Sequence, residues 1–494
     1  MSNDQNERHR IIEEKLSKLE IIRETTEPYP HKYDRTHTSS QLHEMEAELV
    51  ENETVVRIAG RIMAKRKAGR TMFLPLYDCD GKIQIYAKRD DLGDEPFAFF
   101  KKMIDAGDII GVSGTLFRTK TGELTVHVQT FELLSKAVRP LPEKFHDMSL
   151  ELKSRKRYLD LIMNLDARDR FRRRSEILEN VRSFLIEQEF LEVETPVLQP
   201  IYGGATARPF VTHHNALDMP LYLRVADELY LKRLVVGGLE KVFEFCKDFR
   251  NEGMDRTHNP EFTMMECYAA YWDYFDMMDL FEEMVLRLVD KYGDDKKIQY
   301  GEHVLDFSNG FKRLRFLDGI KEKTGIDFGA LDDANVISEA KKLGVTITKG
   351  MGRDKILDEV FGEFVEPNLI QPTFVIDHPK ELSPLAKVNR EDETLVERFE
   401  AFIAGFEVCN SFSELNDPVE QRRRFEAQAK LRAEGDDEAQ VLDEDFLEAL
   451  EMGMPPTGGL GVGLDRLVML FTDCNSIRDV LLFPAMRPEE QGAE

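Results

Sequence analysis

The sequence contains few cysteines and no long apolar run. Its five cysteines are scattered over 494 residues and form no CxxC pair, which argues against a disulfide framework and against a zinc site. No apolar stretch approaches the ~20 residues that a membrane helix needs. The amino-terminal segment MSNDQNERHR lacks the apolar core of a secretion signal. These absences predict a cytoplasmic protein that does not enter a membrane.

An excess of positive charge is also absent, since the formal net charge is −26. That total disfavours nucleic acid as a partner, although phosphate contacts depend on local basic patches and not on the total. The segment RIMAKRKAGRTM (61–72) is such a patch, with five basic side chains and no acidic one. A basic run is most often a solvated face. Here it leads into Phe73, and basic grooves with exposed aromatic side chains suit single-stranded nucleic acid.

The length and a content of 42% hydrophobic and 32% charged residues predict two or three globular domains. An amphipathic helix is predicted over residues 8–24. Short strand-like segments that predict a small closed β unit follow at 55–63, 72–78, 82–88, 108–117 and 124–134. Prolines in 139–148 indicate a linker. The predicted organisation is a helical extension (1–50), the β unit (51–138), the linker (139–152) and a second domain (153–494).

The second domain shows both helical and strand periodicity, which predicts an α+β fold. Helices are predicted over 168–190 and 418–434, and residues 274–345 are expected to be mostly helical. Strand signals occur before Tyr271 and again at 373–377 and 398–412. GGLGVGLDRLVMLF (458–471) predicts a glycine-bounded strand that runs into a helix.

The segment FRNEGMDRTHNPEFTMMECY (249–268) places much charge in a short turn between two alternating strands. After the turn, period-two geometry puts Phe262, Met264, Glu266 and Tyr268 on one face. Burial of such a polar face without a partner would cost free energy. The pattern therefore indicates a polar ligand between these strands, although a solvated hairpin tip is the simpler interpretation from the residues alone.

Three segments carry a family resemblance. FRNEG…HNPEFTMME resembles motif 2 of the class II aminoacyl-tRNA synthetases, and of the lysyl enzymes in particular. FLEVETPVLQPIYGGATARPF (190–210) resembles motif 1 with its following loop, and GLGVGLDRLVML (459–470) resembles motif 3. The resemblance covers nearly the whole chain, and ordered motifs with a matching appended domain are far more specific than a single match. It implies an N-terminal OB-fold β-barrel followed by a class II synthetase antiparallel-sheet catalytic domain.

The resemblance implies an ATP site on motifs 2 and 3. Arg250 would bridge the amino acid's carboxylate and the α-phosphate, and Arg466 would reach the γ-phosphate, which makes these two the expected catalytic residues. The further ATP-binding residues that it implies are Glu252, His258, Asn259, Phe262, Glu407 and Gly463. No GxxxxGK[ST] segment occurs, and GLGVG lacks the third glycine of a dinucleotide loop.

Glu400, Glu407 and Glu414 recur at intervals of seven residues. If Ala404–Gly405 turns the chain, Glu400 and Glu407 approach each other across a hairpin. Two buried like charges repel unless a cation lies between them, and oxygen ligands suit Mg²⁺. From the residues alone, two exposed strand carboxylates would be the simpler interpretation. The resemblance places Mg²⁺ on Glu400 and Glu407.

The resemblance also implies the amino acid and its binding residues. Glu228 would bind the α-amino group, and Glu414, supported by Tyr268, would bind the ε-ammonium of lysine. The full set of lysine-binding residues that it implies is Gly204, Glu228, Arg250, Glu266, Tyr268, Asn410, Phe412 and Glu414. A sibling enzyme for aspartate or asparagine shares this architecture, but an anionic substrate would need a cation deep in the side-chain pocket.

The implied function is ATP-dependent activation of L-lysine to lysyl-adenylate and transfer of lysine to the 3′ end of tRNA(Lys), by a homodimer that forms through motif 1. The anticodon would bind on the OB-fold, and the residues matched to it are Arg66, Phe73, Gln84 and Glu123. A non-catalytic paralogue that binds RNA through the OB-fold is the alternative from another class. The complete set Arg250, Glu252, Glu407 and Arg466 argues against it.

Overall fold

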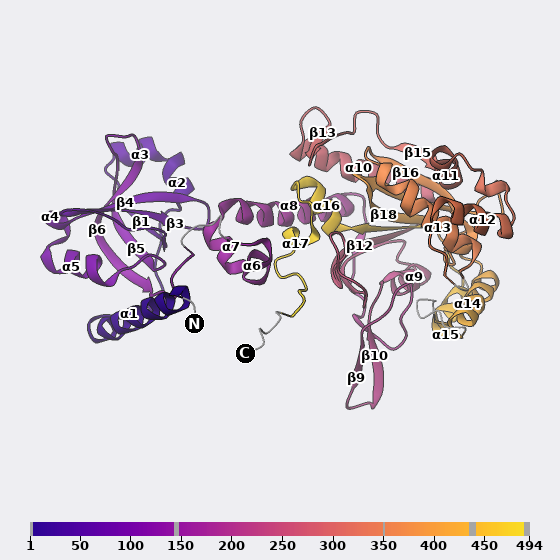
Figure 1. Ribbon diagram of the computed structural model, residues 1–494, viewed down its shortest axis with the longest axis horizontal. Helices are drawn as coiled ribbons and strands as arrows, with labels where there is room; N and C mark the ends of the chain where they lie inside the picture. Colours follow the sequence, from indigo (N-terminus) through magenta and orange to yellow (C-terminus); the bar gives the residue numbers. More distant parts are fainter. Residues whose placement is uncertain (1–2, 143–147, 349–350, 434–440, 489–494) are drawn as a thin grey trace. The chain divides into compact units, whose positions relative to one another are not determined.

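The computed structural model describes residues 3–142, 148–348, 351–433 and 441–488. The chain divides into two compact units, the first formed by residues 1–153 with 158–165 and the second by residues 154–157 with 166–494 (Figure 1). None of the helices in these described ranges is long and apolar enough to cross a membrane.

The first unit is a closed β-barrel, as the sequence predicts. Strand β1 pairs with both β5 and β3, and the order β1-β5-β6-β4-β3 closes on itself, with the short β2 added to β3. The strands are β1 (Val56–Ile62), β2 (Arg66–Ala68), β3 (Thr71–Tyr77), β4 (Lys82–Lys88), β5 (Ile109–Arg118) and β6 (Leu124–Ser135). The helices are α1 (Asn3–Thr25), α2 (Ser39–Glu44), α3 (Glu46–Glu51), α4 (Arg89–Leu92) and α5 (Asp94–Met103).

Alternation along the barrel strands separates a core face from an outer face. In β3, Met72, Leu74 and Leu76 are buried, whereas Phe73 and Tyr77 are only half-buried. Successive side chains of a strand point to opposite faces, so the pattern places Phe73 on the outside of the barrel. The predicted linker (139–152) contains residues 143–147, which lie outside the described ranges. Its last three residues already belong to helix α6 (Leu150–Arg155), and α7 (Arg157–Met163) follows.

The second unit is built on one eight-stranded sheet of order β15-β16-β17-β18-β19-β12-β11-β7. Its central pairs are antiparallel, and only β15–β16 and β7–β11 are parallel. The strands are β7 (Leu191–Glu192), β11 (Lys241–Phe249), β12 (Glu261–Ala270), β15 (Lys312–Arg315), β16 (Thr373–Pro379), β17 (Leu395–Ile403), β18 (Phe406–Ser413) and β19 (Thr457–Gly463). Between β7 and β11 in the sequence, a separate small sheet is formed by β8 (Leu198–Gln199), β10 (Met219–Leu223) and β9 (Val211–His214), in that order.

Helices pack against both faces of this sheet, and one of these faces also borders a cavity. The largest buried cluster, on the face opposite the cavity, combines side chains of α8 (Leu165–Glu187), α10 (Tyr274–Tyr292) and α16 (Leu464–Phe471) with alternate residues of β12 and β19. Met265 and Cys267 of β12 belong to that core, whereas Met264 and Glu266 point to the opposite face and line a cavity. The remaining helices of the unit are α9 (Glu228–Val236), α11 (Phe316–Thr324), α12 (Asp333–Leu343), α13 (Arg353–Phe364), α14 (Pro418–Ala433), α15 (Glu444–Glu451) and α17 (Ile477–Val480).

The prediction of a mostly helical segment at 274–345 is only partly right. Helices α10, α11 and α12 lie there, but β13 (Lys297–Tyr300), β14 (His303–Asp306) and β15 interrupt them. Each of these strands has only four residues, which is too short for a period of two to be distinguished from helical spacing. Pairing partners that lie elsewhere in the chain, such as β16 for β15, stabilise such strands.

Candidate active site

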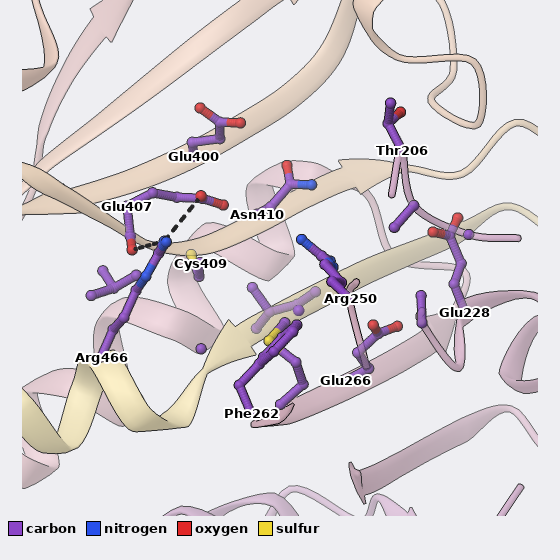
Figure 2. Close-up of a pocket in the computed structure, with 18 of the residues that line it drawn as sticks. Thr206, Glu228, Arg250, Phe262, Glu266, Glu400, Glu407, Cys409, Asn410 and Arg466 are labelled. Atoms are coloured by element: carbon purple, nitrogen blue, oxygen red, sulfur yellow. Dashed lines mark hydrogen bonds and ion pairs between the residues drawn. The ribbon is translucent and has the colours of Figure 1, made fainter. Parts of the chain in front are cut away.

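A single cavity of about 410 Å³ collects the predicted site residues of the second unit. It lies against β12, β18 and β19, on the face of the sheet opposite the cluster of α8, α10 and α16. All the residues assigned above to lysine, ATP and metal contribute to its wall: Gly204, Glu228, Arg250, Glu252, His258, Asn259, Phe262, Glu266, Tyr268, Glu400, Glu407, Asn410, Phe412, Glu414, Gly463 and Arg466. Figure 2 shows Glu228 at one end of this cavity, Glu400, Glu407 and Arg466 at the other, and Arg250 between them.

The hairpin of β11 and β12 positions the central part of the cavity. Its register pairs Glu244 with Glu266 and Asp248 with Phe262, and the backbone N–H of Arg250 donates to Pro260 O at 2.9 Å. The guanidinium of Arg250 lies 5.1 Å from the centre of the Phe262 ring. Within the described chain its Nε has no hydrogen-bond partner. An arginine held over an aromatic ring with donors to spare is suited to bind an anion in this cavity.

Glycines of β19 make room for the buried end of the cavity. Gly459, Gly461 and Gly463 line the cavity, while the side chains of Leu460 and Val462 point into the hydrophobic core. A Cβ atom on Gly459 would lie 2.0 Å from Glu414 Oε1 and 2.6 Å from Tyr268 Cε1. Contacts that close do not occur between real atoms, so a side chain at this position would displace the predicted lysine ligands.

The buried end of the cavity carries acidic side chains. Glu228, Glu266 and Glu414 are exposed by only 5%, 7% and 1%, and burial raises the pKa of all three carboxyls. Tyr268 was expected to support Glu414, but its hydroxyl donates to Glu266 Oε2 at 2.9 Å. Buried carboxylates of this kind require cationic partners, which suits a substrate that carries ammonium groups.

One cation at this end was not predicted from the sequence. Lys232 is fully buried and forms ion pairs with Glu228 and Glu414. Glu228 and Lys232 are four residues apart on helix α9, so they share one face of that helix. The segment ADELYLK contains the signal, but the contact of Lys232 with Glu414 depends on strands that lie far away in the sequence.

The opposite end of the cavity combines basic and acidic side chains. Arg466 donates from Nη1 to the backbone oxygen of Glu407 at 2.8 Å and lies 3.3 Å from its Oε2. Its Nη2 lies 3.0 Å from His258 Nε2, so residues of motifs 2 and 3 meet here. Asn259 also reaches the wall, but its amide donates to Glu261 O at 2.6 Å and accepts from Ala485 N at 3.1 Å.

The turn at Ala404–Gly405 brings Glu400 and Glu407 to this end, as predicted. Both turn residues have positive φ, 56° and 80°. Although burial by itself raises it, Arg398 and His378 hold the pKa of Glu400 down at about 2.

Burial and the charge of Glu400 raise the pKa of Glu407. Burial, followed by Glu407 and Glu400, also raises the pKa of Glu366 to about 7. Burial is the larger cause of both raised pKa values, and repulsion among the neighbouring carboxylates adds to it. A hard divalent cation with oxygen ligands would relieve that repulsion, so the donor set fits Mg²⁺.

A second group of buried acids lies beside Glu266, on the same face of the hairpin. Burial and the charge of Asp248 raise the pKa of Asp227 to about 8, and burial raises the pKa of Asp248 itself to about 6. Asp248 Oδ1 lies 3.5 Å from Arg224 Nε, and Arg224 also pairs with Glu244 at 2.7 Å. Arg224 opposes both shifts, because its positive charge lowers the pKa of each of these carboxyls.

The outer face of the barrel carries an aromatic patch around the predicted Phe73. The Phe73 ring lies 4.8 Å from Tyr86, and Tyr86 lies 5.4 Å from His127 and 5.7 Å from Phe117, measured between ring centres. Tyr86, Phe117 and His127 were not predicted, because the strands that carry them are brought together only by the barrel.

The other predicted barrel residues lie on several elements. Gln84 is half-buried in β4 and donates to Thr125 Oγ1 at 2.9 Å. Glu123 is exposed in the turn before β6. Arg66 lies in β2, paired with Phe73, but its side chain is outside the part that the structure describes.

Family comparisons agree with this geometry. The family described as "tRNA synthetases class II (D, K and N)" matches residues 149–487, and the "OB-fold nucleic acid binding domain" matches residues 56–134. The antiparallel sheet with its three motifs and its single collecting cavity therefore defines a class II tRNA synthetase preceded by an OB-fold.

Full-length relatives narrow the class. The chain is 52% identical to the lysine–tRNA ligase of Carboxydothermus hydrogenoformans over 98% of this chain and 99% of that protein. It is 51% identical to the lysine–tRNA ligase of Staphylococcus epidermidis and 50% identical to that of Oceanobacillus iheyensis, in both cases over 99% of this chain and all of the relative. The chain belongs to the lysine–tRNA ligase family.

Proposed function

We propose that the protein charges tRNA(Lys) with L-lysine in two steps, in the cytoplasm, where such a reaction supplies protein synthesis. In the first step, the lysine carboxylate attacks the α-phosphorus of ATP, and pyrophosphate leaves. In the second, a hydroxyl of the 3′-terminal adenosine of tRNA attacks the carbonyl carbon of lysyl-adenylate, and AMP leaves. The observation that carries the proposal is the buried Glu414 in a cavity whose other end holds Arg466.

Activation needs no side-chain nucleophile, so positioning and charge stabilisation carry the step. Arg250 lies between the acidic end and the basic end of the cavity, where it can bind the lysine carboxylate and the α-phosphate together. Phe262 offers a ring face to adenine, while Arg466 and His258 lie together at the end assigned to the triphosphate. Glu400 and Glu407 would hold Mg²⁺, which when bound offsets the negative charge of the phosphates.

The charge of the pocket favours lysine over aspartate or asparagine. Lys232 is a buried cation next to the side-chain pocket, but Glu228 and Glu414 both cover it. Two carboxyl groups against one ammonium give the pocket an excess of acidic groups, which an ammonium group of a substrate would balance. An anionic side chain would be repelled here, whereas an ammonium would be bound.

ATP–pyrophosphate exchange with each of the twenty amino acids tests the proposal directly. Lysine should be the one amino acid that supports rapid exchange. Exchange that depends on aspartate or asparagine would support the sibling enzyme. Absence of exchange with every amino acid, in a protein that still binds RNA, would support the non-catalytic paralogue.

We infer that the barrel binds the anticodon through the aromatic patch. Loss of one base-stacking aromatic costs ~1–3 kcal/mol, so Phe73→Ala should lower kcat/KM for tRNA charging by about one to two orders of magnitude. Adenylate formation, measured as pyrophosphate exchange, should hardly change. Tyr29, whose hydroxyl bonds to the backbone of Lys136 beyond the end of β6, gives a control: Tyr29→Ala should charge tRNA normally. Equal charging by Phe73→Ala and wild type would remove the patch from recognition.

We also propose a homodimer that forms through motif 1. Phe184, Leu185 and Phe190 of this region are buried within the chain itself, whereas Leu191 and Leu198 are exposed by 51% and 47%. An exposed pair of leucines next to a buried cluster supports a contact surface. Light scattering at micromolar concentration should give twice the chain mass of 57.1 kDa, and a monomer mass would contradict the proposal.

A further inference from the structure

The ammonium of Lys232 occupies a position that the proposed reaction does not use. Lys232 lies on helix α9, is fully buried, and is not part of the cavity wall. Its Nζ forms ion pairs with Glu228 and with Glu414 and lies 5.3 Å from the centre of the Phe412 ring. All three partners line the cavity. The cation therefore lies directly behind the wall that is assigned to the substrate.

Each glutamate uses only one of its oxygens for this cation. Lys232 contacts Oε1 of Glu228 and Oε2 of Glu414. The other oxygen of Glu414 faces Gly459 and has no hydrogen-bond partner among the described residues, and the other oxygen of Glu228 lies near Gly204. Both glycines line the cavity, so the remaining oxygens are directed toward the space where a substrate would lie.

Without the ammonium of Lys232, the carboxylates of Glu228 and Glu414 would repel each other. They are drawn to one ammonium from two different elements, helix α9 and the segment after β18, and burial removes water that could screen them. Although burial by itself lowers it, the charges of Glu228 and Glu414 raise the pKa of Lys232 above its ordinary value. The ammonium is thus permanently charged and opposes the repulsion between the two carboxylates.

We propose that Lys232 is a positioning residue that fixes Glu228 and Glu414 as two separate acceptors for ammonium groups, and thereby sets the length of the amino acid that the pocket selects. This inference rests on the proposed function, in which Glu228 binds the α-amino group and Glu414 the ε-ammonium. A substrate binds both glutamates when its two ammonium groups are as far apart as the remaining oxygens of Glu228 and Glu414. Ornithine, which is shorter by one methylene, cannot satisfy both.

Replacement of Lys232 by methionine tests the proposal, because methionine has a similar length and no charge. Breaking a buried ion pair should raise KM for lysine by roughly a hundredfold or more in pyrophosphate exchange, while KM for ATP stays near the wild-type value. The ratio of kcat/KM for lysine to that for ornithine should fall about tenfold. A residue that only stabilises the fold would lower the melting temperature and the active fraction, but it would leave this ratio unchanged.

The pH dependence of lysine activation also distinguishes a positioning role of Lys232 from a role in fold stability alone. Burial raises the pKa of both Glu228 and Glu414, Lys232 opposes that rise at both, and Arg398 opposes it at Glu228. Once the cation of Lys232 is gone, the pKa of the pair should rise further. Lysine activation is then low at neutral pH and rises as the pair loses its proton. The acid limb of kcat/KM for lysine should therefore move to higher pH in Lys232→Met. In Lys232→Arg, which keeps a cation, that limb should stay in place while the bulkier group raises KM for lysine.

Arg233 provides a matched control on the same helix. It pairs with Asp443 at 2.8 Å, away from the cavity, so Arg233→Met removes a neighbouring cation and should leave KM for lysine and the acid limb unchanged. The proposal is overturned if Lys232→Met keeps the wild-type KM, selectivity and acid limb. If that variant does not fold, a wild-type KM for lysine in Lys232→Arg overturns it. A wild-type protein that does not activate lysine would instead refute the proposed function.

Discussion

Replacement of Glu414 by glutamine should nearly abolish lysine activation and leave ATP binding intact. Glu414 is exposed by only 1%, so its charge interacts with an ammonium in a site without water. Removal of one partner of a buried, hydrogen-bonded charge pair costs about 2–5 kcal/mol, which corresponds to a loss of roughly thirtyfold to several thousandfold. The loss should be seen as a higher KM for lysine in pyrophosphate exchange, while the Kd of ATP, measured by calorimetry, stays near wild type.

The exposed Glu426, on helix α14, gives the control for this substitution. Glu426→Gln changes the same chemical group outside the cavity and should behave as wild type. If Glu414→Gln activates lysine as well as the unaltered protein does, the buried end of the cavity does not recognise the ε-ammonium, and the assignment of the pocket is wrong.

Patterns within single elements predicted most of the fold. The five barrel strands, the helix at Asn3–Thr25 and the strand-to-helix transition at Gly463 appear where alternation, helical spacing and glycine position indicated them. These signals are local, because each depends on residues a few positions apart. The short strands β13 and β14 were missed for the same reason, since four residues give too little pattern.

For the site too, local motifs indicated the residues, whereas contacts between distant segments were missed. Family motifs brought Arg250, Glu407 and Arg466 into one prediction, and the structure places all three on one cavity. Contacts that depend on packing between distant segments were not predictable. The ammonium of Lys232 bridges α9 and the segment after β18. This contact forms only when α9 packs beside the end of β18, and no periodicity within either segment indicates that packing.

In the proposed function, the two ends of the cavity separate binding of lysine from stabilisation of the reaction. The buried end would recognise ammonium groups through carboxylates, and the other end would balance the phosphates with Arg466 and a divalent cation on Glu400 and Glu407. The lysine carboxylate would then meet the α-phosphate between these ends, and both groups are anionic. A cation at the centre is therefore required, and Arg250 is the side chain that lies there.

Arg250→Ala should therefore lower kcat of lysine activation by about two to three orders of magnitude, the scale measured when one donor that stabilises developing charge is removed. Without the guanidinium of Arg250, the negative charge that builds up on the α-phosphate during attack is not stabilised. The fall in kcat should therefore be larger than the rise in KM for ATP. Arg256, in the same turn but not on the cavity wall, is the matched control, and Arg256→Ala should retain most of its activity. A similar loss of kcat in both variants would mean that the turn as a whole, and not the guanidinium of Arg250, stabilises the reaction. Full activity in Arg250→Ala would mean that the carboxylate and the α-phosphate meet elsewhere in the cavity.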